Sequence, residues 1–308
     1  MPETTYHIPA LLPETLQYLD IKENGIYVDA TFGGGGHSRA ILGRLGPDGH
    51  LFGFDQDLDA LANAPDDPRF TFVRSNFRFV RNFLRFYGVE KIDGILADLG
   101  VSFHHFDDAT RGFSFREDAP LDMRMNQKAP QTAAEKLAAY DERDLLSLLR
   151  TCADLKNPGK VAKAIVAARN SGPIDTTFRL ADAVRPALNA KAEKKEMAQV
   201  FQALRIAVNS EMEALTDLLT ETPKILKPGG RAVILTYHSV EDRIVKNFFR
   251  SGNAEGEVEK DFYGQVNCVW RQLTRSPITA DAPEVERNPR SRSAKLRAAQ
   301  LKEDLSDN

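Results

Sequence analysis

Short apolar runs rich in β-branched and aromatic residues alternate with amphipathic stretches along the first hundred residues. Strands are predicted for these runs at residues 26–30, 50–55, 70–74 and 92–99. Helices are predicted between them, where apolar residues recur at intervals of three and four, at residues 38–45, 58–64 and 77–87. Strands that alternate with helices in this way favour a parallel sheet with right-handed crossovers.

The alternation stops near residue 107. Only helical periodicity follows, at residues 133–139, 142–151, 158–171, 177–190 and 195–219. A tight turn at Lys227-Pro-Gly-Gly230 then precedes an apolar strand over 231–237 and a helix over 240–250. Two closing strands are expected at 266–273 and 294–300. We therefore expect an α/β Rossmann-like doubly wound sheet of residues 1–106 and 196–308, with an inserted all-helical domain over 107–195.

Composition narrows the class of protein. The 308 residues suggest about two domains, and 42% hydrophobic with 28% charged residues is typical of a folded globular chain. No stretch reaches the roughly 18 apolar residues that span a bilayer, and the N-terminus does not resemble a secretory signal. Cys152 and Cys268 are too few for a disulfide framework or a four-cysteine zinc site. We expect a cytoplasmic protein with no membrane partner.

The charge is unevenly distributed. The whole chain carries −3, yet residues 150–205 hold eleven Lys or Arg against five Asp or Glu. Residues 287–302 hold six basic residues and no acid. Such segments are often solvated helix faces, but on a mildly acidic protein they also fit a surface that binds phosphates.

A run of four glycines, Gly33 to Gly36, separates the first predicted strand from the first predicted helix. Glycine permits positive φ and lets a ligand approach the backbone, and the helix that follows presents free N–H groups. The dinucleotide pattern G-x-G-x-x-G fails because Ser38 stands at its third glycine. The acid-x-G-x-G-x-G pattern of S-adenosylmethionine (SAM) methyltransferases fits better, starting at Asp29 and with Thr31 replacing the first glycine.

Acids also follow the second and fourth predicted strands. Ligands of doubly wound sheets bind outside the carboxyl ends of the strands. Asp55 is placed to accept hydrogen bonds from a ribose, with Asp57 as the alternative, although Asp55 could instead cap the next helix. Asp98 ends the fourth strand and is expected in the same crevice as Asp29 and Asp55.

Longer segments resemble one family closely, the RsmH (MraW) family of bacterial 16S rRNA cytosine-N4 methyltransferases, over nearly the whole chain. The matching segments lie at residues 7–14, 29–38, 92–102, 107–115, 120–125, 201–211, 237–246 and 288–293. The resemblance implies a class I SAM-dependent methyltransferase fold with a helical insertion. It implies SAM as methyl donor and a cytidine in the decoding region of small-subunit rRNA as acceptor; the sequence leaves a homodimer open.

The resemblance also implies the residues that contact SAM, which are Gly35, Gly36, His37, Asp55, Phe77, Asp98 and His105. Two segments depart from the family pattern. Ser102-Phe-His-His105 stands where the family has Ser-Ser-Pro-Gln, which puts His105 in doubt. Phe79 is an alternative to Phe77 as the adenine contact.

The chemistry of the acceptor suggests one catalytic residue. A cytosine amine is a poor nucleophile and needs hydrogen-bond acceptors, which the Asp98 carboxylate or a nearby backbone carbonyl would supply. Methylation at cytosine C5 would instead need a cysteine nucleophile, and neither cysteine follows a crevice strand. His104 and His105 with Asp107 and Asp108 match no familiar metal spacing, so no metal is expected.

Other residues and functions stay open. His238 follows the fifth strand and either touches substrate or is a loop histidine. Aromatic residues could stack on a flipped base or pack the insertion, namely Phe103, Phe106, Phe113 and Phe115. The alternative functions are a non-catalytic SAM-bound RNA-binding or assembly module and a dinucleotide-dependent dehydrogenase.

Overall fold

A computed structural model describes residues 9–100, 109–260 and 267–303 of the chain. The chain divides into two compact units, one of residues 1–100 with 213–308 and the other of residues 101–212. Each unit buries its own cluster of apolar side chains. Within the described ranges, no helix is long and apolar enough to cross a membrane.

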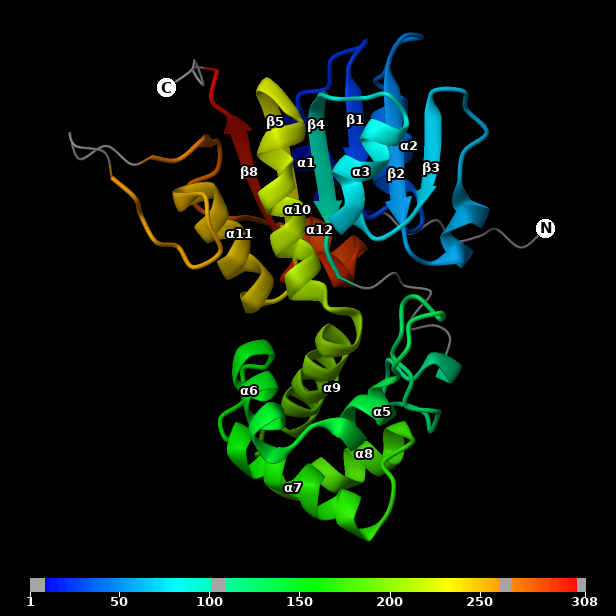
Figure 1. The fold of residues 1–308 in the computed structure, drawn as a ribbon, viewed down its shortest axis with the longest axis vertical. Coiled ribbons are helices and arrows are strands. Elements are labelled where there is room, and N and C mark those ends of the chain that lie inside the picture. The colour runs from blue at the N-terminus through cyan, green and yellow to red at the C-terminus, as the bar shows by residue number, and fades with distance from the viewer. Residues whose placement is uncertain (1–8, 101–108, 261–266, 304–308) are drawn as a thin grey trace. The chain divides into compact units, whose positions relative to one another are not determined.

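The first unit is built on one eight-stranded sheet with the order β3-β2-β1-β4-β5-β8-β6, and β7 pairs with β8. Strands β1 to β5 are parallel, whereas β8 runs antiparallel to its neighbours. Figure 1 shows β2, β3 and β4 ending at the same edge of the sheet. The strands are β1 (Ile26–Asp29), β2 (His50–Asp55), β3 (Phe70–Arg74), β4 (Ile92–Asp98), β5 (Leu226–Thr236), β6 (Trp270–Gln272), β7 (Ile278–Thr279) and β8 (Lys295–Leu301).

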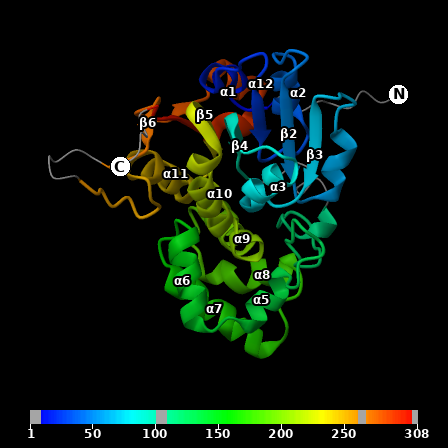
Figure 2. The same cartoon turned by 45° about the horizontal axis from the view of Figure 1, so that its top comes forward.

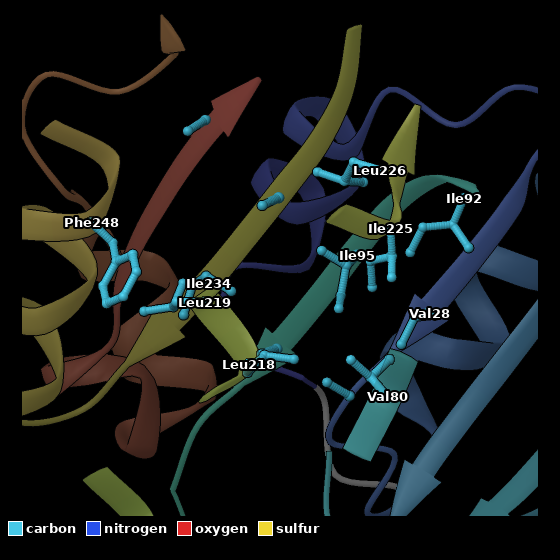
Figure 3. Close-up of a cluster of buried hydrophobic side chains, with 14 of the residues drawn as sticks. Val28, Val80, Ile92, Ile95, Leu218, Leu219, Ile225, Leu226, Ile234 and Phe248 are labelled. Atoms are coloured by element: carbon cyan, nitrogen blue, oxygen red, sulfur yellow. The ribbon is translucent and has the colours of Figure 1, made fainter. Parts of the chain in front are cut away.

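Helices cover both faces of this sheet, because central strands such as β4 are apolar on both sides. Ile95 belongs to the cluster beneath α3, α10 and α11, and its neighbour Leu96 to the cluster beneath α1 and α2. Figure 3 shows part of the first cluster, where Leu218, Leu219 and Phe248 approach the strands. The helices are α1 (Leu12–Leu19), α2 (Gly36–Leu42), η1 (Leu58–Asn63), η2 (Phe77–Phe79), α3 (Val80–Phe86), α10 (Glu211–Ile225), α11 (Ser239–Ser251), α12 (Ala282–Arg287) and η5 (Pro289–Ser293).

The second unit contains helices joined by irregular segments, the longest over residues 112–132, and its described residues hold no strand beyond an isolated bridge between Pro120 and Thr176. Figure 2 shows its helices gathered around a common centre. Their inward faces supply Leu145, Val161, Leu180 and Val200, each no more than 1% exposed. The helices are η3 (Ala109–Arg111), α5 (Ala133–Ala139), α6 (Glu142–Cys152), α7 (Pro158–Ser171), α8 (Thr177–Val184), η4 (Arg185–Ala187) and α9 (Glu193–Asn209).

The α/β sheet with a helical insertion confirms the expected fold class, but three predicted elements were wrong in detail. The helix expected over 195–219 is two helices, because Ser210 adopts φ 50° and ends α9. The helix expected over 177–190 stops at Val184, before Pro186 in η4. The turn predicted at Lys227–Gly230 lies inside β5, as an irregularity where pairing jumps from Ile92–Leu226 to Gly94–Arg231.

Candidate active site

The glycine run forms the loop between β1 and α2. Gly33 and Gly35 have φ of +49° and +72°, a region that side chains disfavour, so these two positions require glycine. A Cβ added at Gly34 would meet no heavy atom within 4 Å. The loop therefore leaves open space above its backbone, as a bound ligand requires.

Two acids tie this loop to the sheet. Asp55, at the end of β2, accepts a hydrogen bond from Gly33 N through Oδ2 at 2.9 Å and from Asp57 N through Oδ1 at 2.8 Å. Asp29, at the end of β1, accepts from Ser38 Oγ at 2.7 Å and from Thr31 N at 3.1 Å. The loop is thus held at both ends by strand-end carboxylates.

Asp29 is also the most deeply buried of the strand-end acids, with 1% exposure. Burial raises the pKa of its carboxyl group, and the hydrogen bond from Ser38 opposes that rise. The sequence identified Asp29 by its place in the motif. The bond to Ser38, nine residues later, appears only in the folded chain.

Asp98 ends β4 in the middle of the same edge. Its backbone N–H donates to Thr31 Oγ1 at 2.6 Å, which ties β4 to the residue that precedes the glycine run by two positions. Its Oδ1 accepts from the Tyr237 hydroxyl at 2.7 Å, and its Oδ2 lies 3.6 Å from His37 Nδ1. Within the described residues, no Lys or Arg lies at ion-pair distance from this carboxylate. Burial raises the pKa of Asp98 to about 7, against the effect of the Tyr237 hydrogen bond.

His37 lies in the first turn of α2 and is 6% exposed. Its Nε2 is 3.2 Å from the carbonyl oxygen of Ala10, which can only accept, so Nε2 carries the hydrogen. Burial lowers the pKa of His37 and favours the neutral ring, whose Nδ1 then presents a lone pair towards Asp98. A proton on Asp98 would lie between two acceptors and relieve their repulsion.

Tyr237 and His238 follow β5 directly. The Tyr237 contact with Asp98 was not anticipated; the only signal was its position at the carboxyl end of a crevice strand. His238 is the N-cap of α11, and its Nδ1 accepts from Glu241 N at 3.4 Å. The side chain of His238 is 10% exposed, so its observed role is to cap the helix.

Phe77 and Phe79 lie after β3, in η2. Phe77 is partly buried and packs against the core, whereas Phe79 is 50% exposed. Asn76, immediately before them, donates through Nδ2 to Gln56 Oε1 at 3.3 Å, so the segments that follow β2 and β3 meet. Adenine contact by Phe77 or Phe79 stays a prediction.

The remaining candidates have structural roles or lie outside the described ranges. Asp57 caps η1 by accepting from Asp59 N. Phe113 is buried in the core of the helical unit and Phe115 packs against it, which supports the packing alternative for this pair. The two cysteines are buried, in α6 and beside β6. His104, His105, Asp107, Asp108, Phe103 and Phe106 lie outside the described residues.

The site fits SAM on three observations: the open space over Gly34, the strand-end carboxylate of Asp55 beside it, and the partly exposed Asp98 next to the loop. A parallel sheet of order 3-2-1-4-5 with an antiparallel strand beyond it, a glycine loop after β1 and acids after β1, β2 and β4 define a class I SAM-dependent methyltransferase.

Comparison with known proteins gives the family. Residues 4–302 match the model of the MraW methylase family, and the chain belongs to that family. It is 54% identical over 300 residues to ribosomal RNA small subunit methyltransferase H of Bacteroides thetaiotaomicron, covering 97% of this chain and 99% of the relative. It is 55% identical over 295 residues to the protein of the same name from Phocaeicola vulgatus, covering 96% and 97%. The predicted family and the predicted class of enzyme are confirmed.

Proposed function

We propose that this protein transfers a methyl group from SAM to the exocyclic N4 amine of a cytidine in the decoding region of 16S rRNA. The observation that carries the proposal is Asp98, a partly exposed carboxylate beside the glycine loop with no cation partner among the described residues. Relatives that match almost the full chain are named small-subunit rRNA methyltransferases, which supports rRNA as the substrate.

The reaction needs an acceptor for one proton. SAM supplies an electrophilic methyl group when it is bound, and the new N–C bond replaces the S–C bond. Asp98 accepts a hydrogen bond from the N4 amine and then takes the proton that N4 loses. A pKa of about 7 suits this role, because a base is most effective when its pKa lies near the working pH.

The residues around the loop divide the remaining tasks. Gly35 and Gly36 are assigned to cofactor binding, Asp55 to the ribose hydroxyls and Phe77 to the adenine. His37 lies 3.6 Å from Asp98 Oδ2 through Nδ1 and is assigned to the same cofactor-binding group. His105 is assigned to the same group on family resemblance alone.

The inserted helical domain, residues 107–195, is assigned to substrate recognition. Near the start of α9, the acids Glu193 and Glu196 are engaged, by Arg185 Nε at 3.0 Å and by Asn189 N at 2.7 Å. Three exposed lysines are left in the same short segment without an acidic partner in the described part of the chain, namely Lys191, Lys194 and Lys195. Cations at a helix N-terminus repel the helix dipole, and RNA phosphates would relieve that repulsion.

Two finer assignments belong with this proposal. We assign the protein to the bacterial cytoplasm because its proposed substrate, the rRNA of the small subunit, lies there. A homodimer stays a prediction, and sedimentation at several protein concentrations tests it. The alternative function, a non-catalytic SAM-bound RNA-binding or assembly module, would also use the glycine loop and the lysines but would not need the proton acceptor.

Small ribosomal subunits from cells that lack this protein give the decisive experiment. They are incubated with the purified protein and isotope-labelled SAM, and the digested nucleosides are identified by mass. Label on N4-methylcytidine is the expected result. Label on another nucleoside would overturn the assigned acceptor, and absence of label with SAM binding intact would favour the non-catalytic module.

The RNA surface has a separate test. The double charge reversal Lys194→Glu with Lys195→Glu should weaken binding to small-subunit rRNA by about tenfold or more at moderate salt. The plot of log affinity against log salt concentration should become less steep, by about the contribution of two phosphate contacts. SAM affinity should not change. Unaltered RNA affinity would reject the role of these lysines.

A further inference from the structure

Tyr237 is placed beside Asp98 by strand pairing. β4 and β5 are parallel neighbours, with Asp98 paired to Leu235, and Leu99 N donates to Leu235 O at 3.0 Å. Because both strands end within two residues of this pair, the first residue after β5 meets the last residue of β4. The contact therefore belongs to the sheet itself and does not depend on a long loop.

Three contacts hold Tyr237 in place. Its hydroxyl donates to Asp98 Oδ1 at 2.7 Å. Its backbone N–H donates to Oε2 of Glu241 at 2.9 Å, and Glu241 is only 2% exposed. Its ring lies against Gly100, where an added Cβ would come within 3.3 Å of a ring carbon. A side chain held in this way defines the direction of the one hydrogen bond it can donate.

We propose that Tyr237 is a positioning residue for methyl transfer, which holds the Asp98 carboxylate in its ionised form and fixes its orientation towards the amine. This inference rests on the proposed role of Asp98 as acceptor. Tyr237 itself does not touch the reacting atoms; it acts only through Oδ1 of Asp98.

The electrostatics of the pair agree with this role. Burial raises the pKa of Tyr237 well above its usual value, and the negative charge of Asp98 adds to that rise, so the hydroxyl remains a donor throughout the working pH range. A hydrogen bond to the ionised form of a carboxyl group favours ionisation. Tyr237 thus offsets part of the effect of burial, which keeps Asp98 able to accept a proton near neutral pH.

Among the described residues, other titratable groups face the same pair from four neighbouring elements. Asp29 comes from the end of β1, His37 from α2, Glu241 from α11 and Glu284 from α12. The carboxylates of Glu241 and Glu284 oppose further ionisation nearby, and Glu241 raises the pKa of Asp98. Among the described residues around Asp98, the tyrosine hydroxyl is the donor that acts in the other direction.

The test compares the wild-type protein with Tyr237→Phe, which removes only the hydroxyl. The Asp98 carboxyl carbon resonance, assigned as the one that disappears in Asp98→Asn, is titrated by NMR in the protein without ligand. Its midpoint should rise by about one pH unit in Tyr237→Phe, since a hydrogen bond to a charged group is lost. The acidic limb of single-turnover methylation should move by the same amount. Tyr87→Phe, a matched control at a half-exposed tyrosine of the same unit, should change neither.

A second measurement changes the donor strength of the hydroxyl without removing it. Biosynthetic replacement of the seven tyrosines by 3-fluorotyrosine makes each hydroxyl a stronger donor. The Asp98 midpoint should then fall, and Tyr237→Phe in the same background should abolish the fall.

The outcomes separate this inference from the proposed function. An Asp98 midpoint that is insensitive to both changes overturns the role of Tyr237, whatever the activity. So does a loss of turnover that is equal at every pH with an unmoved midpoint, because that pattern indicates packing alone. If the midpoint moves but Asp98→Asn keeps full turnover, the proposed role of Asp98 fails while its contact with Tyr237 stands.

Discussion

An aspartate lies near each end of β4, and the surroundings of the two side chains differ. Asp93, near the amino end, has its side chain 7% exposed and lies 2.7 Å from Lys227 Nζ and 3.9 Å from Lys22 Nζ. Its Oδ2 also accepts from Ile26 N at 2.9 Å, which joins β4 to β1. Asp98, at the carboxyl end, has a tyrosine and a histidine as neighbours, and the described residues place no Lys or Arg beside it.

The comparison indicates that the aspartate at one end of β4 stabilises the sheet and the aspartate at the other end serves the reaction. A carboxylate that is paired and hydrogen-bonded, as Asp93 is, joins neighbouring strands. A carboxylate that is buried without a cation costs stability but can accept a proton near neutral pH. At the carboxyl edge of the sheet, Asp98 is therefore expected to lower stability while it serves the reaction. At the amino edge, Asp93 is expected to raise stability.

The largest expected effect is on turnover at the carboxyl end. Asp98→Asn keeps the shape of the side chain but cannot take a proton, so single-turnover methylation at saturating SAM should fall by about a hundredfold or more. Asp93→Asn is the matched control on the same strand and should stay within about twofold of wild type per folded molecule. Full turnover in Asp98→Asn would show that Asp98 is not the proton acceptor.

The next effect is on stability at the amino end. Asp93→Ala leaves Ile26 N without its acceptor and should lower the free energy of unfolding by about 2 kcal/mol, measured by urea denaturation. The ion pairs add little, because Lys22 and Lys227 are 70% and 45% exposed and can return to water. Asp93→Asn keeps an acceptor oxygen and should lose less. If both variants lose the same free energy of unfolding, then the charge of Asp93, and not its hydrogen bond with Ile26, stabilises this end of β4.

The third effect is a gain in stability, whereas the substitution of Asp93 causes a loss. The carboxyl group of Asp98 has its pKa raised from 3.8 to about 7 by burial, so the folded protein binds more protons than the unfolded chain between these values. Wild-type stability therefore decreases as pH rises through this window, and the amide of Asp98→Asn avoids that loss. The variant should be more stable than wild type by about 1 kcal/mol at pH 8, after allowance for the partial exposure of the side chain.

The check is a pair of unfolding curves at several pH values. The advantage of Asp98→Asn should shrink as pH falls from about 7 towards 4 and should be absent near pH 2, where the aspartate is neutral in both states. A difference that does not change with pH would show that Asp98 is not held at a raised pKa.

Much of this edge could be predicted from local patterns. The strand–helix alternation predicted a parallel sheet, and the rule that ligands bind at the carboxyl ends of its strands predicted that Asp29, Asp55 and Asp98 lie at one edge. Positive φ at Gly33 and Gly35 followed from residue type. These features depend on a few neighbouring residues and on general rules of parallel sheets.

Contacts between distant segments could not be predicted in the same way. Tyr237 reaches Asp98 only because β4 and β5 pair in one register across 139 residues of sequence. The break at Ser210 was also missed, because apolar residues on α9 and α10 continue one helical pattern through it. Local periodicity reports which face is buried and carries no information about a single residue in the left-handed region.

The smallest expected effect shows that a residue at the carboxyl edge can still be structural. His238 is the N-cap of α11, so His238→Ala should lower the free energy of unfolding by about 1 kcal/mol, whereas His238→Asn, a good N-cap, should recover most of it. Methylation per folded molecule should be unchanged in both variants, measured at saturating SAM and rRNA. If both variants lose turnover by tenfold or more, His238 contacts the substrate, and the carboxyl edge is catalytic over a wider area than Asp98 and its neighbours.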